Sequence, residues 1–319
     1  MKAISIVVAI FICSIYYFVG GELFPDYKNY ITISENGGWL FDPNEYFFEW
    51  VSRWWLRELP SYVSHVIAVD LLAFAVQLIY VVWLICAVKK SEIVAKYWIT
   101  VLSGPLLLTT TLRGTVAYLA AYLLVDGENR SFLKSTPILL LGLSFHDSFL
   151  IVALICIISY VLSAYLGRRL LISIYIFSVF MIFFGSYLLG GLGSLILILG
   201  IGIRDVYFME ISGPSIIKTI YALFVAALVF PIVWSKNIEN PQSTLIIVLL
   251  FAASSILFGL SSTPAIRMLL FVSGMAVLVG FSRGLYSLYF YRPSVMIFLG
   301  MPIISIMFWD LFRNASNAT

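Results

Sequence analysis

Two polar clusters interrupt long apolar segments of this chain. Residues 109–113 read Thr-Thr-Thr-Leu-Arg, and residues 145–148 read Phe-His-Asp-Ser. An ionisable side chain at membrane depth costs about 3 kcal/mol on insertion scales, so such a residue usually faces a wet cavity and has a function. The guanidinium of Arg113 matches the oxygens of a pyrophosphate, and the imidazole of His146 can orient or deprotonate a hydroxyl. The clusters therefore predict a polar site near one membrane face.

Other side chains near this predicted face are candidates for the same site. Asp70 lies five residues into an apolar stretch, where it either pairs with an arginine such as Arg113 or acts as a base. Asp26 is a second candidate base or a ligand for sugar hydroxyls. Tyr27 and Tyr30 follow it closely and have rings that suit stacking on sugars. Ordinary structural roles remain open for all of them, including a snorkelling arginine at position 113.

Late in the chain, three further arginines are candidate ligands for an anionic substrate. Arg267 follows the sequence Ser-Ser-Thr-Pro at 261–264, which predicts a break in a membrane span. Arg283 precedes Gly284 and Arg292 precedes Pro293, and we expect at least one of these three arginines to reach the cavity, with Arg267 as the first choice.

Composition restricts the class of protein. Of the 319 residues, 62% are hydrophobic and only 11% are charged, and the mean hydropathy is +1.03. Long apolar runs, rather than alternating ones, favour helices over a membrane barrel. The sequence contains no P-loop, no dinucleotide fingerprint and no metal-ligand motif, so we expect no cofactor and no metal. The three cysteines lie within apolar runs without paired spacing.

The apolar runs predict an all-α polytopic membrane protein of about ten to twelve helices, since each span needs roughly 20 residues. We treat residues 1–319 as a single integral membrane domain. Two runs, 114–125 and 136–146, are about half a span, which favours re-entrant or broken helices. The predicted spans are 3–20, 65–88, 97–111, 114–125, 136–146, 149–166, 170–186, 188–203, 214–234, 244–260, 265–281 and 293–310.

Lysine and arginine in short loops orient the predicted spans. The alternation places Lys2, Lys89, Lys90, Lys96, Arg130, Lys134, Arg168 and Arg169 in the cytoplasm. The 21–64 loop, Arg113, His146, the 235–243 loop and Arg283 then fall on the outer side. After residue 186 a glycine-rich run leaves the alternation open.

The 21–64 loop is predicted to contain an amphipathic helix at 43–58. Asp42 is a plausible N-cap and Pro43 suits the first helical position. Tryptophans cover much of this helix, while charged residues recur every four positions along one face. The pattern indicates a helix lying at the outer membrane–water interface, with an aromatic surface toward lipid.

Four short motifs, in chain order, resemble those of the EpsG-like exopolysaccharide polymerases, which are related in role to the Wzy-type O-antigen polymerases. The motifs are Pro25-Asp26-Tyr27 with Tyr30, Leu112-Arg113-Gly114 with Ala117, His146-Asp147-Ser148, and Arg267 near a helix start. Gly114 stands where that family usually has glutamine after the arginine. The resemblance covers most of the chain.

The resemblance implies a metal-independent glycosyltransferase of the GT-C type in the bacterial cytoplasmic (inner) membrane. Such an enzyme works on the periplasmic side and transfers the growing glycan from undecaprenyl pyrophosphate to a new lipid-linked repeat unit. A chain-length regulator and a flippase are possible partners. We rank His146, then Asp26, then Asp70 as the base, with Arg113, Arg267, Arg283, Tyr27 and Tyr30 as substrate ligands. The alternatives are another lipid-linked glycosyltransferase, an acyltransferase acting on surface glycans, or a transporter of lipid-linked sugars.

Overall fold

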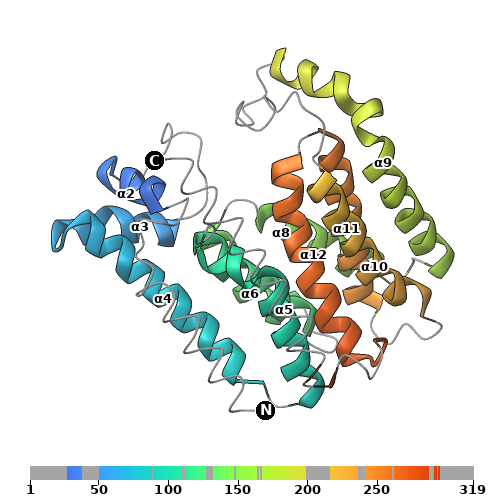
Figure 1. Ribbon diagram of the computed structural model, residues 1–319, viewed down its shortest axis with the longest axis horizontal. Helices are drawn as coiled ribbons and strands as arrows, with labels where there is room; N and C mark the ends of the chain where they lie inside the picture. Colours follow the sequence, from blue (N-terminus) through green and yellow to red (C-terminus); the bar gives the residue numbers. More distant parts are fainter. Residues whose placement is uncertain are drawn as a thin grey trace. The chain divides into compact units, whose positions relative to one another are not determined.

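The structure is a computed structural model, and its described residues are almost entirely helical (Figure 1). No strand occurs among them, which confirms the prediction of an all-α protein. The described residues are 27–37, 50–87, 89–109, 112–126, 132–146, 149–163, 165, 167–198, 216–235, 241–260, 262–286, 291–292 and 294.

Four of the described helices are long and apolar enough to cross a membrane. They contain the segments His65–Ile85, Arg168–Gly185, Pro241–Leu260 and Ala265–Ser282. Shorter apolar helices occupy Gly114–Val125, Phe149–Leu162 and Lys218–Trp234. The protein is therefore a multi-pass membrane protein. The predicted first and last spans, 3–20 and 293–310, lie outside the described residues.

The chain divides into two compact units, whereas the sequence predicts a single membrane domain. Unit 1 comprises Met1–Leu123, Leu133–Leu150 and Tyr286–Thr319, and unit 2 comprises Leu124–Phe132 and Ile151–Leu285. The helices that lie wholly or mainly in unit 1 are α2 (Tyr27–Glu35), α3 (Trp50–Glu58), α4 (His65–Ile85), α5 (Lys90–Thr109), α6 (Leu112–Asp126) and α7 (Phe132–Phe145). The helices of unit 2 are α8 (Phe149–Leu162), which begins in unit 1, α9 (Arg168–Ile198), α10 (Ile216–Trp234), α11 (Pro241–Leu260) and α12 (Ser262–Ser282).

Within unit 1, α4 begins at a well-formed cap and runs antiparallel to α5. The Ser64 hydroxyl accepts a hydrogen bond from the backbone N–H of Ile67 (3.3 Å), which satisfies one of the donors left free at the helix start. Further along, the Tyr80 hydroxyl meets that of Thr100 at 3.0 Å. Lys96, almost fully buried, donates to the carbonyl of Trp83 (2.7 Å) and pairs with Glu92 (2.8 Å). Buried polar groups thus meet partners at the α4–α5 contact, as burial requires.

In unit 2, one long helix replaces two predicted spans. The glycine-rich run predicts separate spans at 170–186 and 188–203. Instead, α9 is one helix of 31 residues that includes the first part of this run. A helical glycine costs only about 1 kcal/mol relative to alanine, so tertiary packing can override it. Gly185 also has a packing role, because a Cβ built on Gly259 of α11 would lie 2.6 Å from the Gly185 carbonyl carbon.

Replacing Gly259 by alanine should therefore destabilise unit 2. The new methyl meets backbone rather than a flexible side chain, so α9 and α11 must separate, at a cost of about 1–3 kcal/mol. The thermal midpoint in detergent measures this loss. Ile256→Ala, on the exposed side of the same helix, is the control, and an equal or larger loss there would contradict the close α9–α11 contact.

Two arginines show which helix ends of unit 2 lie together. Arg168, at the start of α9, donates to the carbonyl of Trp234 at the end of α10 (2.8 Å). Arg283, just after α12, donates to the Thr244 hydroxyl in the first turn of α11 (2.8 Å). Because α10 ends where α11 begins, Arg168 and Arg283 lie at the same end of unit 2.

This arrangement corrects the predicted sidedness of Arg283 and of the 235–243 loop. The prediction put them outside and Arg168 in the cytoplasm, yet all three share one end. The error arises from counting α9 twice, since removing one crossing reverses the parity of every later span. Arg267 is sixteen residues before Arg283, about 24 Å along the helix. It therefore lies toward the opposite end of unit 2 from the arginines at 168 and 169, which the positive-inside rule assigns to the cytoplasm.

Cysteine labelling at the two ends of α10 tests this orientation. In a variant without Cys13, Cys86 and Cys156, we expect Ile216→Cys to react with a membrane-impermeant maleimide added to intact cells. Ser235→Cys should react only after the membrane is permeabilised. The reverse pattern would contradict the corrected topology of unit 2.

Candidate functional site

The short helix α2 packs across the first turns of α4 through two polar contacts. The Tyr27 hydroxyl donates to Oδ1 of Asp70 at 2.8 Å, and the Ser34 hydroxyl lies 2.9 Å from Nδ1 of His65. The start of α2 thus meets Asp70 and its end meets His65, so the two helices run in opposite directions. These contacts connect the segment before the first described span to the start of that span.

Apolar packing holds the same elements together. The buried cluster consists of Tyr27, Tyr30, Ile33, Leu56, Val69, Leu72, Ala73, Val76 and Val116, with Ile31, Trp55 and Phe145 against it. Its members on α2 recur every three residues, which places them along one face of that helix. Four helices, α2, α3, α4 and α6, therefore share this core, and the last residue of α7 packs on it.

The cluster also brings the two motif-bearing helix ends of unit 1 together. Val116 is one turn after Arg113, so the start of α6 reaches the cluster. At the end of α7, the Phe145 carbonyl accepts a hydrogen bond from the Ser52 hydroxyl of α3 (3.4 Å). His146 follows directly. We call this region the polar end of unit 1. It is defined by Tyr27, Ser34, Arg53, His65, Asp70 and His146, together with the start of α6.

The carboxylate of Asp70 is hydrogen-bonded to a tyrosine side chain. The Tyr27 hydroxyl donates to Oδ1 of this carboxylate, so the contact at Oδ1 is with a tyrosine and not with an arginine, the partner that one of the two predicted alternatives gives it. Within the described part of the chain, no residue pairs with the other carboxylate oxygen. A half-buried carboxylate fixed through one oxygen can accept a hydrogen bond from a substrate hydroxyl through the other.

Tyr27 and Tyr30 are more buried than a sugar-stacking role requires. Each has 5% of its surface exposed, with its ring in the cluster. Tyr27 therefore reaches Asp70 through its hydroxyl, while its ring face lies within the cluster.

The remaining predicted residues are placed less fully. His146 is half-buried, and its backbone N–H donates to the Gly142 carbonyl at 3.1 Å, so it extends the α7 hydrogen-bond pattern by one residue. Arg113 is the second residue of α6, and its side chain lies outside the described part of the structure. Asp26 also lies outside the described residues. Arg267 and Arg283 belong to unit 2, toward its opposite ends.

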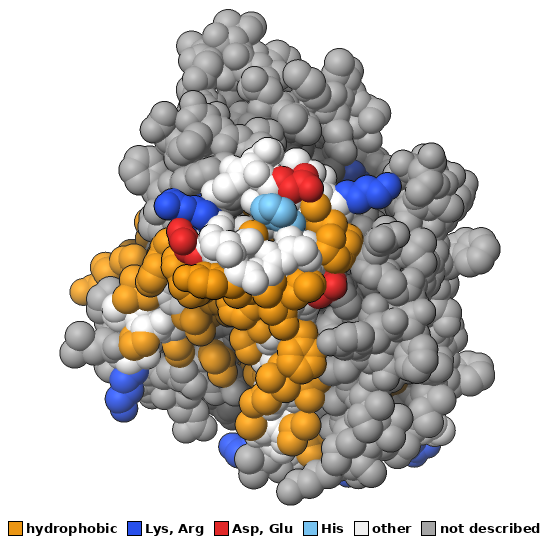
Figure 2. Space-filling view, turned by 90° about the vertical axis from the view of Figure 1, so that its left-hand side faces the viewer, with side chains coloured by type: hydrophobic (Ala, Val, Ile, Leu, Met, Phe, Trp, Pro, Cys, Tyr) orange, Lys and Arg blue, Asp and Glu red, His pale blue; other side chains and the backbone are white. Residues whose placement is uncertain are grey.

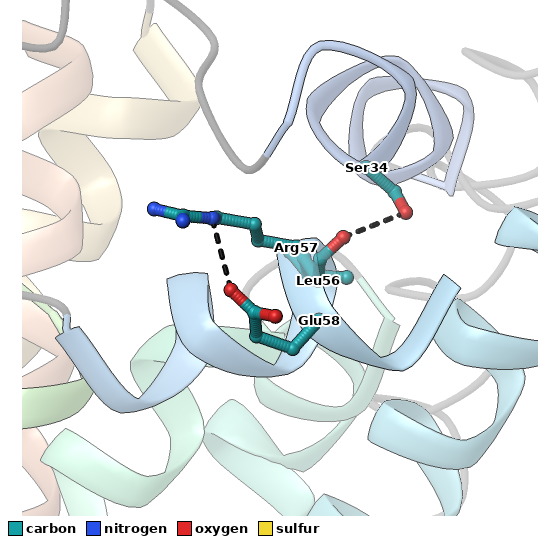
Figure 3. Close-up of polar contacts among 4 residues, drawn as sticks. All are labelled: Ser34, Leu56, Arg57 and Glu58. Atoms are coloured by element: carbon teal, nitrogen blue, oxygen red, sulfur yellow. Dashed lines mark hydrogen bonds and ion pairs between the residues drawn. The ribbon is translucent and has the colours of Figure 1, made fainter. Parts of the chain in front are cut away.

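Helix α3 exposes two of its three tryptophans and buries two of its polar side chains. Trp50 is 61% exposed and Trp54 is 63% exposed, while Ser52 and Arg53 are buried. This inversion is expected for a helix at the lipid headgroup level, where tryptophan is favoured. The described helix covers the second half of the predicted 43–58 segment, whose first half lies outside the described residues. Arg57 pairs with Glu58 at 3.0 Å, but both are exposed, so the pair adds little stability (Figure 3).

Figure 2 shows a histidine with acidic and basic side chains around it, above a largely hydrophobic surface. Sequence reasoning missed two members of the polar end, His65 and Ser34. His65 is one of only two histidines in the chain and precedes Asp70 by five residues, a signal that was present in the sequence. Ser34 carried no signal, because its importance arises from a contact with a residue 31 positions away.

The chain was compared with protein-family models, with curated proteins and with solved structures, and none of them matches it.

Proposed function

We propose that the protein is a membrane glycosyltransferase that polymerises lipid-linked oligosaccharide repeat units, in the manner of the EpsG-like and Wzy-type polymerases. The observation that carries the proposal is the bond from Tyr27 to Asp70. It fixes a carboxylate at one end of a membrane span, close to the helix ends that bear Arg113 and His146. Such a group can hold a sugar hydroxyl beside the membrane.

The proposed reaction needs a proton acceptor and cations. The acceptor hydroxyl attacks the anomeric carbon of the donor glycan, and the bond from that carbon to the pyrophosphate oxygen breaks. The electron pair leaves with undecaprenyl pyrophosphate, whose developing charge is best stabilised by fixed cations. Arg113, at the start of α6, is our candidate for such a cation within unit 1. Asp70 orients the acceptor sugar, and a nearby imidazole takes the proton.

We place this activity on the periplasmic side of a bacterial inner membrane. Support comes from the positive-inside rule, which assigns Lys89 and Lys90 at the far end of α4 to the cytoplasm. Because α4 crosses the membrane, its first turns then face the periplasm. A flippase would supply the lipid-linked units on that side, and a chain-length regulator is a further possible partner.

A deletion strain tests the proposal in cells. We expect it to lose the long polymer while single repeat units still reach the cell surface, since their synthesis and export precede polymerisation. Loss of single units as well would instead favour a transporter of lipid-linked sugars. Loss of an acyl substituent with normal polymer length would favour an acyltransferase.

Tyr27→Phe probes the observation that supports the proposal. The ring and its packing remain, but Asp70 loses its hydrogen bond, so we expect polymer synthesis to fall about 10- to 100-fold, an effect of about 1.5–3 kcal/mol. Tyr80→Phe is the matched control. It removes a buried tyrosine hydroxyl bonded to Thr100, about 15 Å along α4 from Asp70. Equal losses of activity in the two variants would argue for a general stability effect.

A further inference from the structure

Three groups at the polar end of unit 1 form a continuous hydrogen-bonded chain. The Ser34 hydroxyl donates to the Leu56 carbonyl at 2.9 Å (Figure 3). The same oxygen lies 2.9 Å from Nδ1 of His65. Ser34 and Leu56 are fully enclosed, with 2% and 0% of their surfaces exposed. At this burial, Ser34 and Leu56 hydrogen-bond to protein groups and not to solvent. Which group donates in each hydrogen bond therefore depends on which of the protein groups carries a proton.

Pro60 explains why the Leu56 carbonyl accepts its hydrogen bond from the Ser34 hydroxyl and not from the backbone of its own helix. In a continuing helix that carbonyl would accept from the backbone N–H four residues later. Here that residue is Pro60, which has no N–H, and α3 ends at Glu58. A buried carbonyl without a donor is costly, so the Ser34 hydroxyl supplies one from another helix.

The two contacts of the Ser34 hydroxyl determine the tautomer of His65. A serine hydroxyl has one proton, and a carbonyl can only accept, so the Ser34 proton lies toward Leu56. The short contact between Ser34 and Nδ1 can then be a hydrogen bond only if Nδ1 carries the proton. In the neutral ring, Nε2 consequently has the lone pair. Within the described part of the chain, no other side chain pairs with this half-buried imidazole.

We infer that His65 is the proton acceptor for the attacking hydroxyl, held in the Nδ1–H tautomer by Ser34. The assignment rests on the proposed function. As the new glycosidic bond forms and the bond to pyrophosphate breaks, the hydroxyl proton passes to Nε2 of His65. The resulting imidazolium then gives that proton to the pyrophosphate product or to water, which restores the neutral ring.

Ser34 is a positioning residue in this scheme. A base whose second nitrogen is fixed by a hydrogen bond presents its lone pair in one orientation, as in other sites where an orienting group holds a histidine. Asp70 lies in the first turns of the same helix and is fixed by the same short helix α2. The structure thus assigns the two residues different tasks, sugar orientation to Asp70 and proton transfer to His65.

The tautomer can be measured without any enzyme assay. In the full-length His146→Asn protein, purified through a tag without histidine, His65 is the only imidazole. Nitrogen-15 NMR of the labelled ring should show a protonated Nδ1 and an unprotonated Nε2. Pro60→Ala restores an N–H that can reach Leu56, so it should shift part of the population to the Nε2–H form. Ser34→Ala should do the same. A protonated Nε2 in the parent protein would overturn the inference.

Turnover tests the chemical role. In the otherwise native chain, His65→Asn should lower kcat by about 100-fold or more with KM little changed. Pro60→Ala and Ser34→Ala should lower kcat in proportion to the Nδ1–H population that they lose. Full activity of His65→Asn would overturn the role of His65 as proton acceptor. So would kcat values in Pro60→Ala and Ser34→Ala that do not follow the Nδ1–H population. If the native protein makes no polymer, the proposed function fails, and the catalytic role of His65 fails with it. The NMR measurement is independent of that result, because it shows which nitrogen of His65 carries the proton.

Discussion

Asp70→Asn should reduce polymer synthesis by about 100- to 1,000-fold, an effect of about 3–4 kcal/mol on the transfer step. Asparagine has the shape of aspartate and can still accept from Tyr27. It lacks the negative charge, however, and offers an amide where the second carboxylate oxygen was. The loss should therefore affect the chemistry without unfolding α4. The initial rate of undecaprenyl pyrophosphate release is the measurement.

Gln77→Asn is the control for Asp70→Asn. It shortens another polar side chain on the same face of α4, two turns further from the polar end, where Gln77 is 2% exposed. We expect it to lower stability through lost packing and to leave the rate of the folded protein nearly unchanged. A rate for Asp70→Asn within about threefold of this control would remove Asp70 from the site, since threefold is below 1 kcal/mol.

Arg267→Ala and Arg283→Ala should have opposite outcomes. If Arg267 holds the leaving pyrophosphate, its loss should slow transfer by about 100- to 1,000-fold, as expected for removing one fixed stabilising group. Arg283 lies toward the other end of unit 2 and is bonded to Thr244. Arg283→Ala should therefore weaken the α11–α12 contact and lower the thermal midpoint, with the rate per folded molecule preserved.

The same assay of pyrophosphate release, normalised to folded protein, separates these two arginines. Arg267→Lys should recover only part of the rate, because lysine keeps the charge but lacks the planar fork of donors. If Arg283→Ala lost activity and Arg267→Ala kept it, Arg283 would be the ligand of the pyrophosphate. That result would also favour the outer position that the sequence predicts for Arg283.

The sequence was most informative about the apolar helices. Long runs of apolar residues predicted α4, α10, α11 and α12 close to their observed bounds, because lipid burial requires such runs. The glycine-rich run predicted two spans where the chain forms the single helix α9. A glycine-rich run marks either a break or a close helix contact, and only the tertiary partner, here Gly259 against Gly185, distinguishes them. That single error reversed the predicted sidedness of Arg283.

At the candidate site, residue types were predictable and their partners were not. Asp70 stood out because a carboxylate within an apolar span is rare. Its bond to Tyr27 joins residues 43 positions apart, which local pattern cannot reveal. His65 was missed for a related reason. Its rarity and its distance from Asp70 are visible in the sequence, but its proposed role depends on Pro60, Leu56 and a serine from a separate helix, which meet only when α2, α3 and α4 pack together.

The most direct test of the central claim uses purified protein and lipid-linked repeat units. The products are followed as a glycan ladder on a gel and as released undecaprenyl pyrophosphate. We predict a ladder with the native protein, in step with lipid pyrophosphate release, and its loss in Asp70→Asn and Arg113→Ala. Absence of a ladder with well-folded native protein, together with movement of intact lipid-linked units across a vesicle membrane, would contradict the account.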